Sequence, residues 1–545
     1  MLSDIEISRQ VKMRHIYKVA KELNINKKCL ELYGSSMAKI DVEKVPDKSN
    51  QGKLILVSAI SPTKFGEGKS TVAIGLADAL RSLGKKSCLT LREPSLGPVF
   101  GIKGGACGGG YSQIVPMDKI NLHFTGDMYA ITSANNLLSA IIDNHIFQGN
   151  QLNIKEVYFK RCLDVNDRAL KSVEIFGGRK DKFTITSASE MMAILSLATD
   201  LSNLKRRLGN IIVGKDVDGK LIYARDLKAQ DAMAILLKDA IKPNLVQTLE
   251  HTPAIVHCGP FANIAHGCNS LVATKFALKC SDYVVTEAGF GADLGAEKFI
   301  DLKCQVGNIK PDVIVLVATI KALKFHGGAN IDEINNENME ALNNGLANLN
   351  RHIDNIRNVF NLPVVVAINK FNFDTEKEIE VVKEYVKSLN AKVSVTTAFA
   401  EGSKGACDLA KQVMDLCKDK TEVKFAYDLE DSVKTKIDKI AKRIYHAGSV
   451  KYSAEAKRVL EEIKDTSYDK LPVVIAKTQY SFSDDKDKIN APTDFDITIK
   501  DIQVMGGAEF VVAIAGNMLL MPGLAKHSAY ENMTIDRNGT IEGLF

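Results

Sequence analysis

Short, continuous apolar runs recur along the chain and predict strands that are buried on both faces. These runs are rich in Val and Ile and are bounded by Gly, Pro or charged residues, a pattern typical of parallel sheets. Seven runs are predicted as strands, at residues 54–60, 211–213, 283–286, 313–319, 364–369, 473–476 and 511–515.

Helical patterns lie between these runs. The clearest follows the first run, where Ile74, Ala77 and Leu80 recur at helical spacing and Gly84 stands where a helix C-terminal glycine is expected. Strand and helix alternate along most of the chain. This alternation predicts an α/β protein with a doubly wound, mostly parallel sheet that binds ligands at the carboxyl ends of its strands.

Two charged stretches of helical character, 333–357 and 376–387, flank the run at 364–369 and suggest a domain boundary near residue 360. We therefore expect a ligand-binding core over residues 1–360, with an inserted subdomain at about 145–240. An additional C-terminal α/β domain over residues 361–545 would complete the ligand cleft.

Composition and charge exclude several classes of protein. Of the 545 residues, 45% are hydrophobic and 25% are charged, as in ordinary globular proteins. The formal net charge of +5 is dilute and shows no basic cluster, which argues against a nucleic-acid partner. The longest apolar stretch, 510–524, contains Asn517 and Pro522 and is too short to span a membrane.

The cysteines and the N-terminal segment indicate the cellular compartment in which we expect the protein. The ten cysteines include no Cys-x-x-Cys pair, and several stand in apolar runs, as reduced thiols do. The charged N-terminal segment lacks the apolar core of a signal peptide. We expect a soluble, cytoplasmic protein without a membrane partner.

A phosphate-loop pattern follows the first predicted strand. Residues 61–71 read SPTKFGEGKST and lead into a predicted helix, so a turn that binds nothing is the weaker interpretation. Backbone amides at the glycines, a lysine charge and a hydroxyl for Mg²⁺ together suit ATP or GTP and predict a fold of the P-loop NTPase type. The candidate nucleotide-binding residues are Thr63, Lys64, Phe65, Gly66, Glu67, Gly68, Lys69, Ser70 and Thr71, with Ser70 as the metal ligand.

Two positions in this loop depart from the usual pattern. Thr63 stands where the first glycine is expected. Lys64 has the spacing of the extra lysine in the variant P-loops of cell-division and metal-chaperone ATPases, which keeps a nucleotide-switched, partner-binding ATPase open as an alternative. A solvated loop lysine is the interpretation that we favour.

A glycine-rich segment at residues 91–113 places Arg92 and Glu93 directly after a strand that ends near Leu91. So many glycines predict a loop whose backbone approaches a ligand closely. The glycines stand at positions 97, 101, 104, 105, 108, 109 and 110.

Ten segments, in this order and including the glycine-rich one, resemble the formate–tetrahydrofolate ligase family over essentially the whole chain. They are residues 91–113, 120–131, 133–146, 164–170, 239–254, 259–270, 286–299, 362–371, 471–485 and 521–529, followed by the C-terminal Gly543-Leu544-Phe545. The resemblance implies that MgATP and formate give formyl phosphate, which then formylates tetrahydrofolate to 10-formyltetrahydrofolate. It also implies activation by K⁺ or NH₄⁺ and a homotetramer.

The chemistry of several residues suits this reaction. Formate is already an anion, so the first step needs charge neutralisation, which Lys69, Arg92 and Mg²⁺ can supply. The planar fork of Arg92 suits formate and formyl phosphate, with a salt bridge to a carboxylate as the alternative. Lys69, Arg92 and Glu93 are the predicted catalytic residues. The base that takes the amine proton stays open among Glu93, Asp127, His123 and His266, each of which could instead be structural.

Aromatic residues at strand ends are candidate stacking surfaces. Phe290 follows the predicted strand at 283–286, and the resemblance places aromatic residues at Phe371 and Phe399 against the nucleotide base or the folate. The family usually has tryptophan at the latter position, and this chain has none. Asn372 and Cys258 also depart from the family. Together with the missing tryptophan, these departures leave open the alternative of a diverged paralogue with weak or altered folate ligation.

Overall fold

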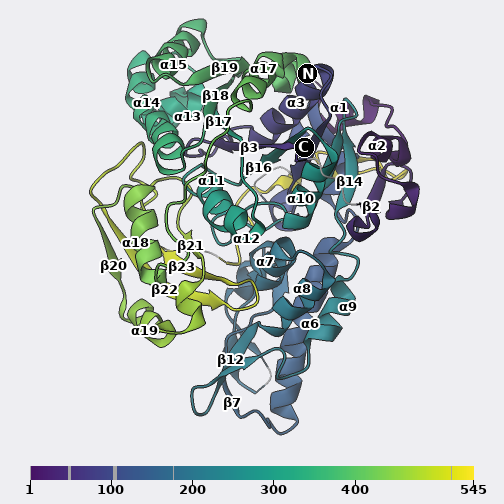
Figure 1. Ribbon diagram of the computed structural model, residues 1–545, viewed down its shortest axis with the longest axis vertical. Helices are drawn as coiled ribbons and strands as arrows, with labels where there is room; N and C mark the ends of the chain where they lie inside the picture. Colours follow the sequence, from purple (N-terminus) through teal and green to yellow (C-terminus); the bar gives the residue numbers. More distant parts are fainter. Residues whose placement is uncertain are drawn as a thin grey trace.

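The computed structural model describes residues 2–46, 51–101, 107–175, 177–516, 518 and 520–544. Several positions used in the sequence interpretation lie outside the described residues, namely Gly104, Gly105, Asn517 and Phe545. Figure 1 shows a large central sheet with helices on both sides, a smaller sheet beside it and a helical region below.

Among the described residues, the large sheet has twelve strands, seven of which run parallel. In spatial order these seven are β15 (Pro253–Val256), β4 (Ser87–Leu91), β16 (Tyr283–Glu287), β3 (Lys53–Ala59), β17 (Val313–Ala318), β18 (Val364–Asn369) and β19 (Lys392–Thr396). Antiparallel strands extend one edge: β14 (Asn244–Thr248), β2 (Met37–Ile40), β1 (Leu30–Tyr33), β6 (Ser112–Val115) and β5 (Gly108–Gly109).

Strand β3 shows why the apolar runs are continuous. Leu54 and Leu56 enter one hydrophobic core, and Ile55 and Val57 enter the other, because successive side chains of a strand point to opposite faces. All four are fully buried. The prediction of an α/β protein with a mainly parallel sheet covered on both faces is therefore confirmed.

The helices divide between the two faces of this sheet. One core contains α3 (Lys69–Ser82) and α17 (Cys407–Leu416). The other contains α10 (Leu271–Cys280), α14 (Met339–Asp354) and α15 (Glu376–Ser388). The predicted glycine after α3 is confirmed, since Gly84 has a φ of +77° just beyond the C-cap.

Three of the seven predicted strand runs belong to two smaller sheets, and the first of these runs is antiparallel although its composition predicts a parallel strand. The run at 211–213 enters β12 (Ile212–Asp216), the centre of an antiparallel sheet with β7 (Ile154–Val157) and β13 (Leu221–Tyr223). The last two runs form β21 (Val473–Ala476) and β23 (Phe510–Ala515), which join β22 (Asp496–Met505) and β20 (Ser449–Tyr452) in a mixed four-stranded sheet.

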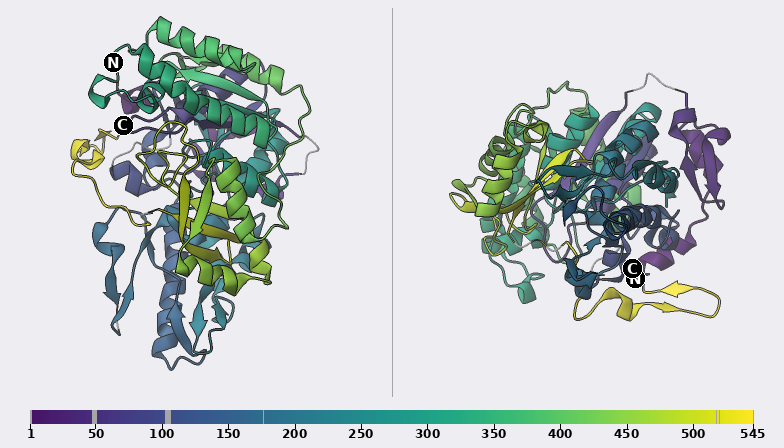
Figure 2. Two further views of the ribbon diagram at one scale, coloured as in Figure 1. Left: turned by 90° about the vertical axis from the view of Figure 1, so that its left-hand side faces the viewer. Right: turned by 90° about the horizontal axis from the view of Figure 1, so that it is seen from below.

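The remaining elements surround these sheets. Helices within residues 127–237 and the antiparallel sheet form most of a third core, which the four-stranded sheet also enters. Figure 2 shows this segment, coloured blue to teal, next to the green and yellow strands of the four-stranded sheet. Other helices of the described chain are α1 (Asp4–Gln10), α2 (Ile16–Glu22), α4 (Leu96–Phe100), α5 (Met117–Asn121), α6 (Asp127–Phe147), α7 (Glu190–Leu197), α8 (Leu201–Gly209), α9 (Gln230–Leu237), α11 (Gly295–Lys298), α12 (Gln305–Gly307), α13 (Ile320–His326), α16 (Ala398–Glu401), α18 (Val433–Arg443) and α19 (Ala454–Ile463). None of the described helices has both the length and the apolar character of a membrane span.

Candidate functional site

The loop between β3 and α3 takes the shape that its glycines predict. Gly66 and Gly68 have φ values of +76° and +72°, in the region that favours glycine. A Cβ at Gly68 would also lie only 2.3 Å from Nδ2 of Asn369. Gly68 is the N-cap of the 14-residue helix α3, so the first free amides and the positive end of the helix dipole face the loop.

Glu67 holds this loop from within. Its Oε1 accepts hydrogen bonds from the backbone N and the hydroxyl of Thr63, at 2.8 and 3.0 Å, and its Oε2 accepts one from the Thr319 hydroxyl at 2.7 Å. Asn369 donates to the carbonyl of Glu67 at 3.1 Å. Two of the predicted nucleotide-binding residues, Thr63 and Glu67, thus bond to each other, and the adjacent strands β17 and β18 fix their position.

A second set of contacts fixes the start of the loop, and sequence analysis did not find it. Ser61 donates its backbone N to Asn348 Oδ1 at 3.3 Å, and its hydroxyl lies 3.1 Å from His352 Nε2. The Ser61 carbonyl lies 2.9 Å from His326 Nε2. These partners lie on α13 and α14, some 265 or more residues away in the chain, so no local pattern could reveal them.

One carboxylate connects the phosphate loop to the arginine after β4. The Ser70 hydroxyl donates to Glu287 Oε2 at 2.7 Å, and Arg92 Nη2 lies 3.9 Å from Glu287 Oε1. Glu287 is the last residue of β16, which stands between β4 and β3 in the sheet. The carboxyl ends of three neighbouring parallel strands therefore bring Ser70, Glu287 and Arg92 together, with Lys69 beginning the helix beside them.

Arg92 is largely buried but sparsely bonded. Its side chain is 23% exposed, its Nη1 donates to the Pro260 carbonyl at a long 3.4 Å, and its Nε is buried without a hydrogen-bond partner. A Cβ at Gly289 would lie 2.9 Å from Nη1, so glycine there leaves room for the guanidinium. The expected alternative, a salt bridge to a carboxylate, is present in weak form at Glu287.

Glu93 is buried next to Arg92 in the chain. Its Oε2 has no hydrogen-bond partner in the described structure. Burial is the main cause that raises the pKa of Glu93 well above its usual range, and the nearby Asp127 carboxylate adds to this while Lys39 opposes it. A carboxyl of this kind holds its proton to higher pH than an exposed one.

The other candidate bases occupy three different settings. Asp127 pairs with Lys39 at 2.7 Å and accepts a hydrogen bond from Asn244 at 2.8 Å, deep in the protein. His123 is exposed. His266 is fully buried, neither ring nitrogen has a hydrogen-bond partner among the described residues, and burial lowers its pKa to about 3.

Three phenylalanine rings surround one ammonium group near the loop. Lys321 Nζ lies 5.8, 5.4 and 5.4 Å from the ring centres of Phe65, Phe371 and Phe373. These are cation–π contacts at the outer edge of the useful range. Phe65 and Phe371 were predicted site residues, whereas Phe373 and Lys321 were not. Phe290, with a φ of +60°, is packed against the core as a partly buried residue.

Phe399 follows β19 and lies against the glycine-rich segment. A Cβ at Gly109 would meet its ring at 3.1 Å, and one at Gly110 would meet its carbonyl at 2.1 Å. The Tyr111 amide donates to that same carbonyl at 2.8 Å. Phe399 remains 43% exposed. Since Asn369 and Thr396 are register partners on parallel strands, Phe371 and Phe399 lie at the same sheet edge.

The glycine-rich segment approaches other parts of the chain, which changes the interpretation of its glycines. A Cβ at Gly97 or Gly101 would collide with Asn166, and one at Gly108 with the Ser112 carbonyl. The glycines of this segment that the structure describes therefore permit close packing within the protein. Lys64, by contrast, is exposed on the phosphate loop.

The fold and this site define an α/β protein whose polar residues converge at the carboxyl edge of a parallel sheet, around a strand–loop–helix unit. The family model for formate–tetrahydrofolate ligase matches residues 2–545. The chain is 56% identical to the formate–tetrahydrofolate ligase of Campylobacter concisus, 54% to that of Symbiobacterium thermophilum and 55% to that of Campylobacter curvus, over the full length of each pair. The chain belongs to the formate–tetrahydrofolate ligase family.

Proposed function

We propose that this protein joins formate to tetrahydrofolate with ATP, giving 10-formyltetrahydrofolate, ADP and phosphate. The observation that carries the proposal is the convergence of Ser70, Glu287 and Arg92 beside Lys69. This arrangement places a phosphate loop next to a largely buried guanidinium that lacks strong partners, in a chain whose whole length matches the ligase family.

In the first step, formate attacks the γ-phosphate of ATP and forms formyl phosphate. Formate needs no base, because it is already ionised. Lys69 and the loop amides hold the phosphates, and Arg92 holds formate in line and offsets the repulsion between the two anions. Glycine at position 289 keeps the space beside Nη1 open for this arrangement.

Mg²⁺ fits the oxygen atoms beside the loop. Ser70 offers a hydroxyl, and Glu287 offers a carboxylate whose Oε1 is buried without a hydrogen-bond partner in the described structure. Oxygen donors of this kind are those that Mg²⁺ prefers. When bound, the ion would neutralise charge on the phosphates, and Ser70 and Glu287 are the residues that would hold it.

In the second step, the tetrahydrofolate amine attacks the formyl carbon of formyl phosphate and loses a proton, and the C–O bond to phosphate breaks so that phosphate leaves. Arg92 and Lys69 stabilise the oxyanion that forms. Among the candidate bases, Glu93 suits the task best, because its raised pKa brings it nearer to neutral pH and its Oε2 has no partner in the described structure. Exposure of His123 and the low pKa of His266 count against those two histidines.

The aromatic residues would bind the planar parts of the substrates. Phe65 and Phe371, with Lys321 between them, would contact the nucleotide base, and Phe399 and Phe290 would contact the folate. The exposed 43% of Phe399 leaves a ring surface available for stacking.

Several further properties expected from the sequence remain proposals. They are the P-loop NTPase type of fold, the division into residues 1–360 with an insert at 145–240 and residues 361–545, activation by K⁺ or NH₄⁺, a homotetramer and a cytoplasmic location. The large sheet continues past residue 360 through β18 and β19, and the four-stranded sheet begins at Ser449.

An omission assay on the purified protein tests the proposal. Product is followed as methenyltetrahydrofolate after acid treatment, with MgATP, formate, tetrahydrofolate and K⁺ each left out in turn. We expect product only when all three substrates are present. ATP hydrolysis that depends on a protein effector and needs neither formate nor tetrahydrofolate would instead support the switch ATPase, and bound ATP without product would support a diverged paralogue.

A further inference from the structure

A large cavity lies apart from the phosphate loop, between the two smaller sheets. It has a volume of about 850 Å³, which is within the range of small-molecule sites. Its walls come from the β7 and β12 region on one side and from β22 and β23 on the other, with α19 at its margin. None of the residues assigned above to nucleotide, formate or folate lines it.

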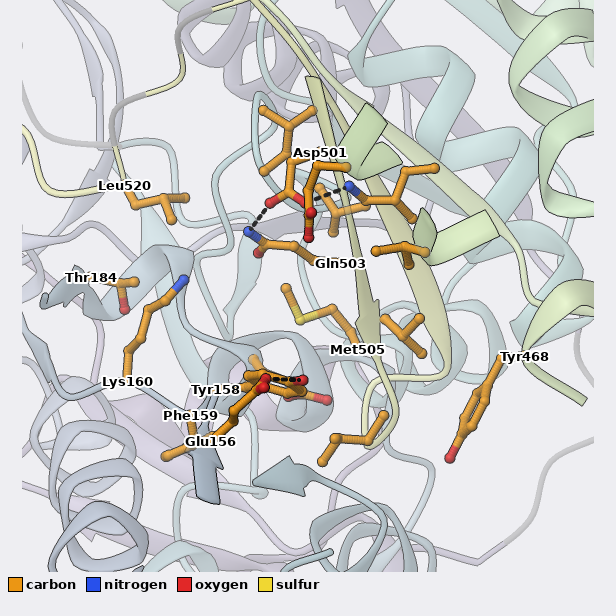
Figure 3. A pocket seen from close by; sticks show the side chains of 18 of the residues that line it. Glu156, Tyr158, Phe159, Lys160, Thr184, Tyr468, Asp501, Gln503, Met505 and Leu520 are labelled. Atoms are coloured by element: carbon orange, nitrogen blue, oxygen red, sulfur yellow. Dashed lines mark hydrogen bonds between the residues drawn. The ribbon is translucent and has the colours of Figure 1, made fainter. Parts of the chain in front are cut away.

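One wall of the cavity is apolar. Met505, Val512 and Ile514 of the four-stranded sheet line it together with Phe159 and Ile212. Figure 3 shows the Met505 side chain reaching into the space above Phe159. Such a wall can accept a hydrocarbon or aromatic group and exclude water from it.

One end of the cavity holds an ammonium group. Lys160 follows β7 and extends toward Gln503 and Asp501, as Figure 3 shows. No hydrogen bond or ion pair of its Nζ is present in the described structure. Burial lowers its pKa to about 8, and the positive charge of Lys182 contributes to this, while Asp501 and Asp181 oppose it. Lys160 is only partly buried, but a partly desolvated cation without a partner is still unfavourable, so an anion in this place would stabilise it.

Most of the other charged residues that line the cavity are already engaged. Lys215 pairs with Glu462 at 2.8 Å, and Arg458 pairs with Glu455 at 2.5 Å. Among the acids, Asp501 accepts a hydrogen bond from Gln503 at 3.0 Å, Glu190 accepts two from the backbone of Gly507 and Ala508, and Glu156 accepts one from Tyr158. Lys160 and Lys182 are thus the lining cations for which the described chain supplies no ion pair.

We propose that this cavity is a second binding site, for an amphipathic organic anion. Its acidic group binds Lys160 and Lys182, and its apolar body lies against Met505, Val512 and Ile514. The site goes beyond the proposed ligase function and uses none of the residues assigned to it.

Anilinonaphthalene sulfonate is a suitable probe, because it combines a sulfonate with an aromatic body and fluoresces in apolar surroundings. Titration of the full-length protein in the absence of substrates should give saturable binding. Lys160→Met should weaken it about tenfold or more, the loss expected when a charge-assisted hydrogen bond is removed. Ile514→Trp should abolish it by filling the cavity. Lys155→Met is the matched control, since Lys155 lies on β7, is exposed and does not line the cavity.

Three outcomes would overturn the proposal: equal affinities of the Lys160→Met and Lys155→Met proteins, unchanged binding to a folded Ile514→Trp protein, or competition by MgATP or tetrahydrofolate. If Ile514→Trp does not fold, Ala188→Leu, at another lining residue, fills the same cavity and replaces it. The titration contains no substrate, so its result does not depend on whether the ligase activity is found.

Discussion

The phosphate loop and the surroundings of Arg92 lie side by side but differ in how their polar groups are satisfied. In the loop, both carboxylate oxygens of Glu67 accept hydrogen bonds from Thr63 and Thr319. Around Arg92, the guanidinium Nε, Glu93 Oε2 and Glu287 Oε1 are buried without hydrogen bonds in the described structure.

This difference shows which polar groups the protein satisfies with its own residues and which it leaves for a ligand to satisfy. Buried polar atoms of native proteins are nearly always paired, and an unpaired one costs about 1–3 kcal/mol. The loop is therefore already in its working shape. The Arg92 side carries several unmet donors and acceptors in one place, which charged substrates and a cation would satisfy. The loop is thus preorganised, and the groups available for reaction lie around Arg92.

The largest expected effect concerns the unsatisfied region. Arg92→Ala should lower kcat/KM for formate by about a thousandfold, because the repulsion between formate and the γ-phosphate is no longer offset. ATP affinity, measured by calorimetry, should change no more than about twofold, since Lys69 and the loop amides remain. A large loss of ATP binding in this variant would mean that Arg92 serves the nucleotide, and the contrast between the regions would fail.

A smaller effect should follow from damage to the satisfied region. Glu67→Gln places an amide NH₂ against donor groups, so the loop should lose its shape and ATP should bind about ten- to thirtyfold more weakly. Thr319→Val removes only one of the bonds and should cost about threefold. The same calorimetric titration checks both. If Glu67→Gln binds ATP as tightly as the natural protein, then hydrogen bonds to Glu67 do not maintain the loop.

The loop and the sheet could be predicted from sequence because their signals are local. Continuous apolar runs mark strands with two buried faces, and glycines two residues apart mark positive φ values before a helix. Strand ends could be placed from the same kind of signal, and Arg92 and Phe371 do follow the carboxyl ends of β4 and β18.

The missed parts depend on contacts between distant segments. His352 and Asn348 hold Ser61 across 291 and 287 residues of sequence, and each looks like an ordinary helix residue. The run that enters β12 has the composition of a parallel strand, but its partners are decided by tertiary packing. The glycines at positions 97 and 101 indicated that another group approaches the backbone closely. The sequence could not show that this group is Asn166 and not a ligand.

The smallest expected effect tests whether the unmet carboxyl of Glu93 costs stability. Folding raises the pKa of Glu93, so the folded protein holds this proton more tightly than the unfolded chain does. As pH rises above the ordinary glutamate range, the unfolded chain releases its proton first and gains stability relative to the folded state. The free energy of unfolding of the natural protein should therefore fall with rising pH, by roughly 1–3 kcal/mol from this group.

Glu93→Gln removes the titration while keeping the shape of the side chain, so its thermal midpoint should depend less on pH than that of the natural protein. The gap between the two should widen from acidic to neutral pH, with the variant the more stable at neutral pH. Glu43→Gln, at an exposed carboxylate, is the control and should leave the profile as it is. Parallel profiles for Glu93→Gln and the natural protein would mean that Glu93 finds a partner in solution, and the Arg92 region would then be as well satisfied as the loop.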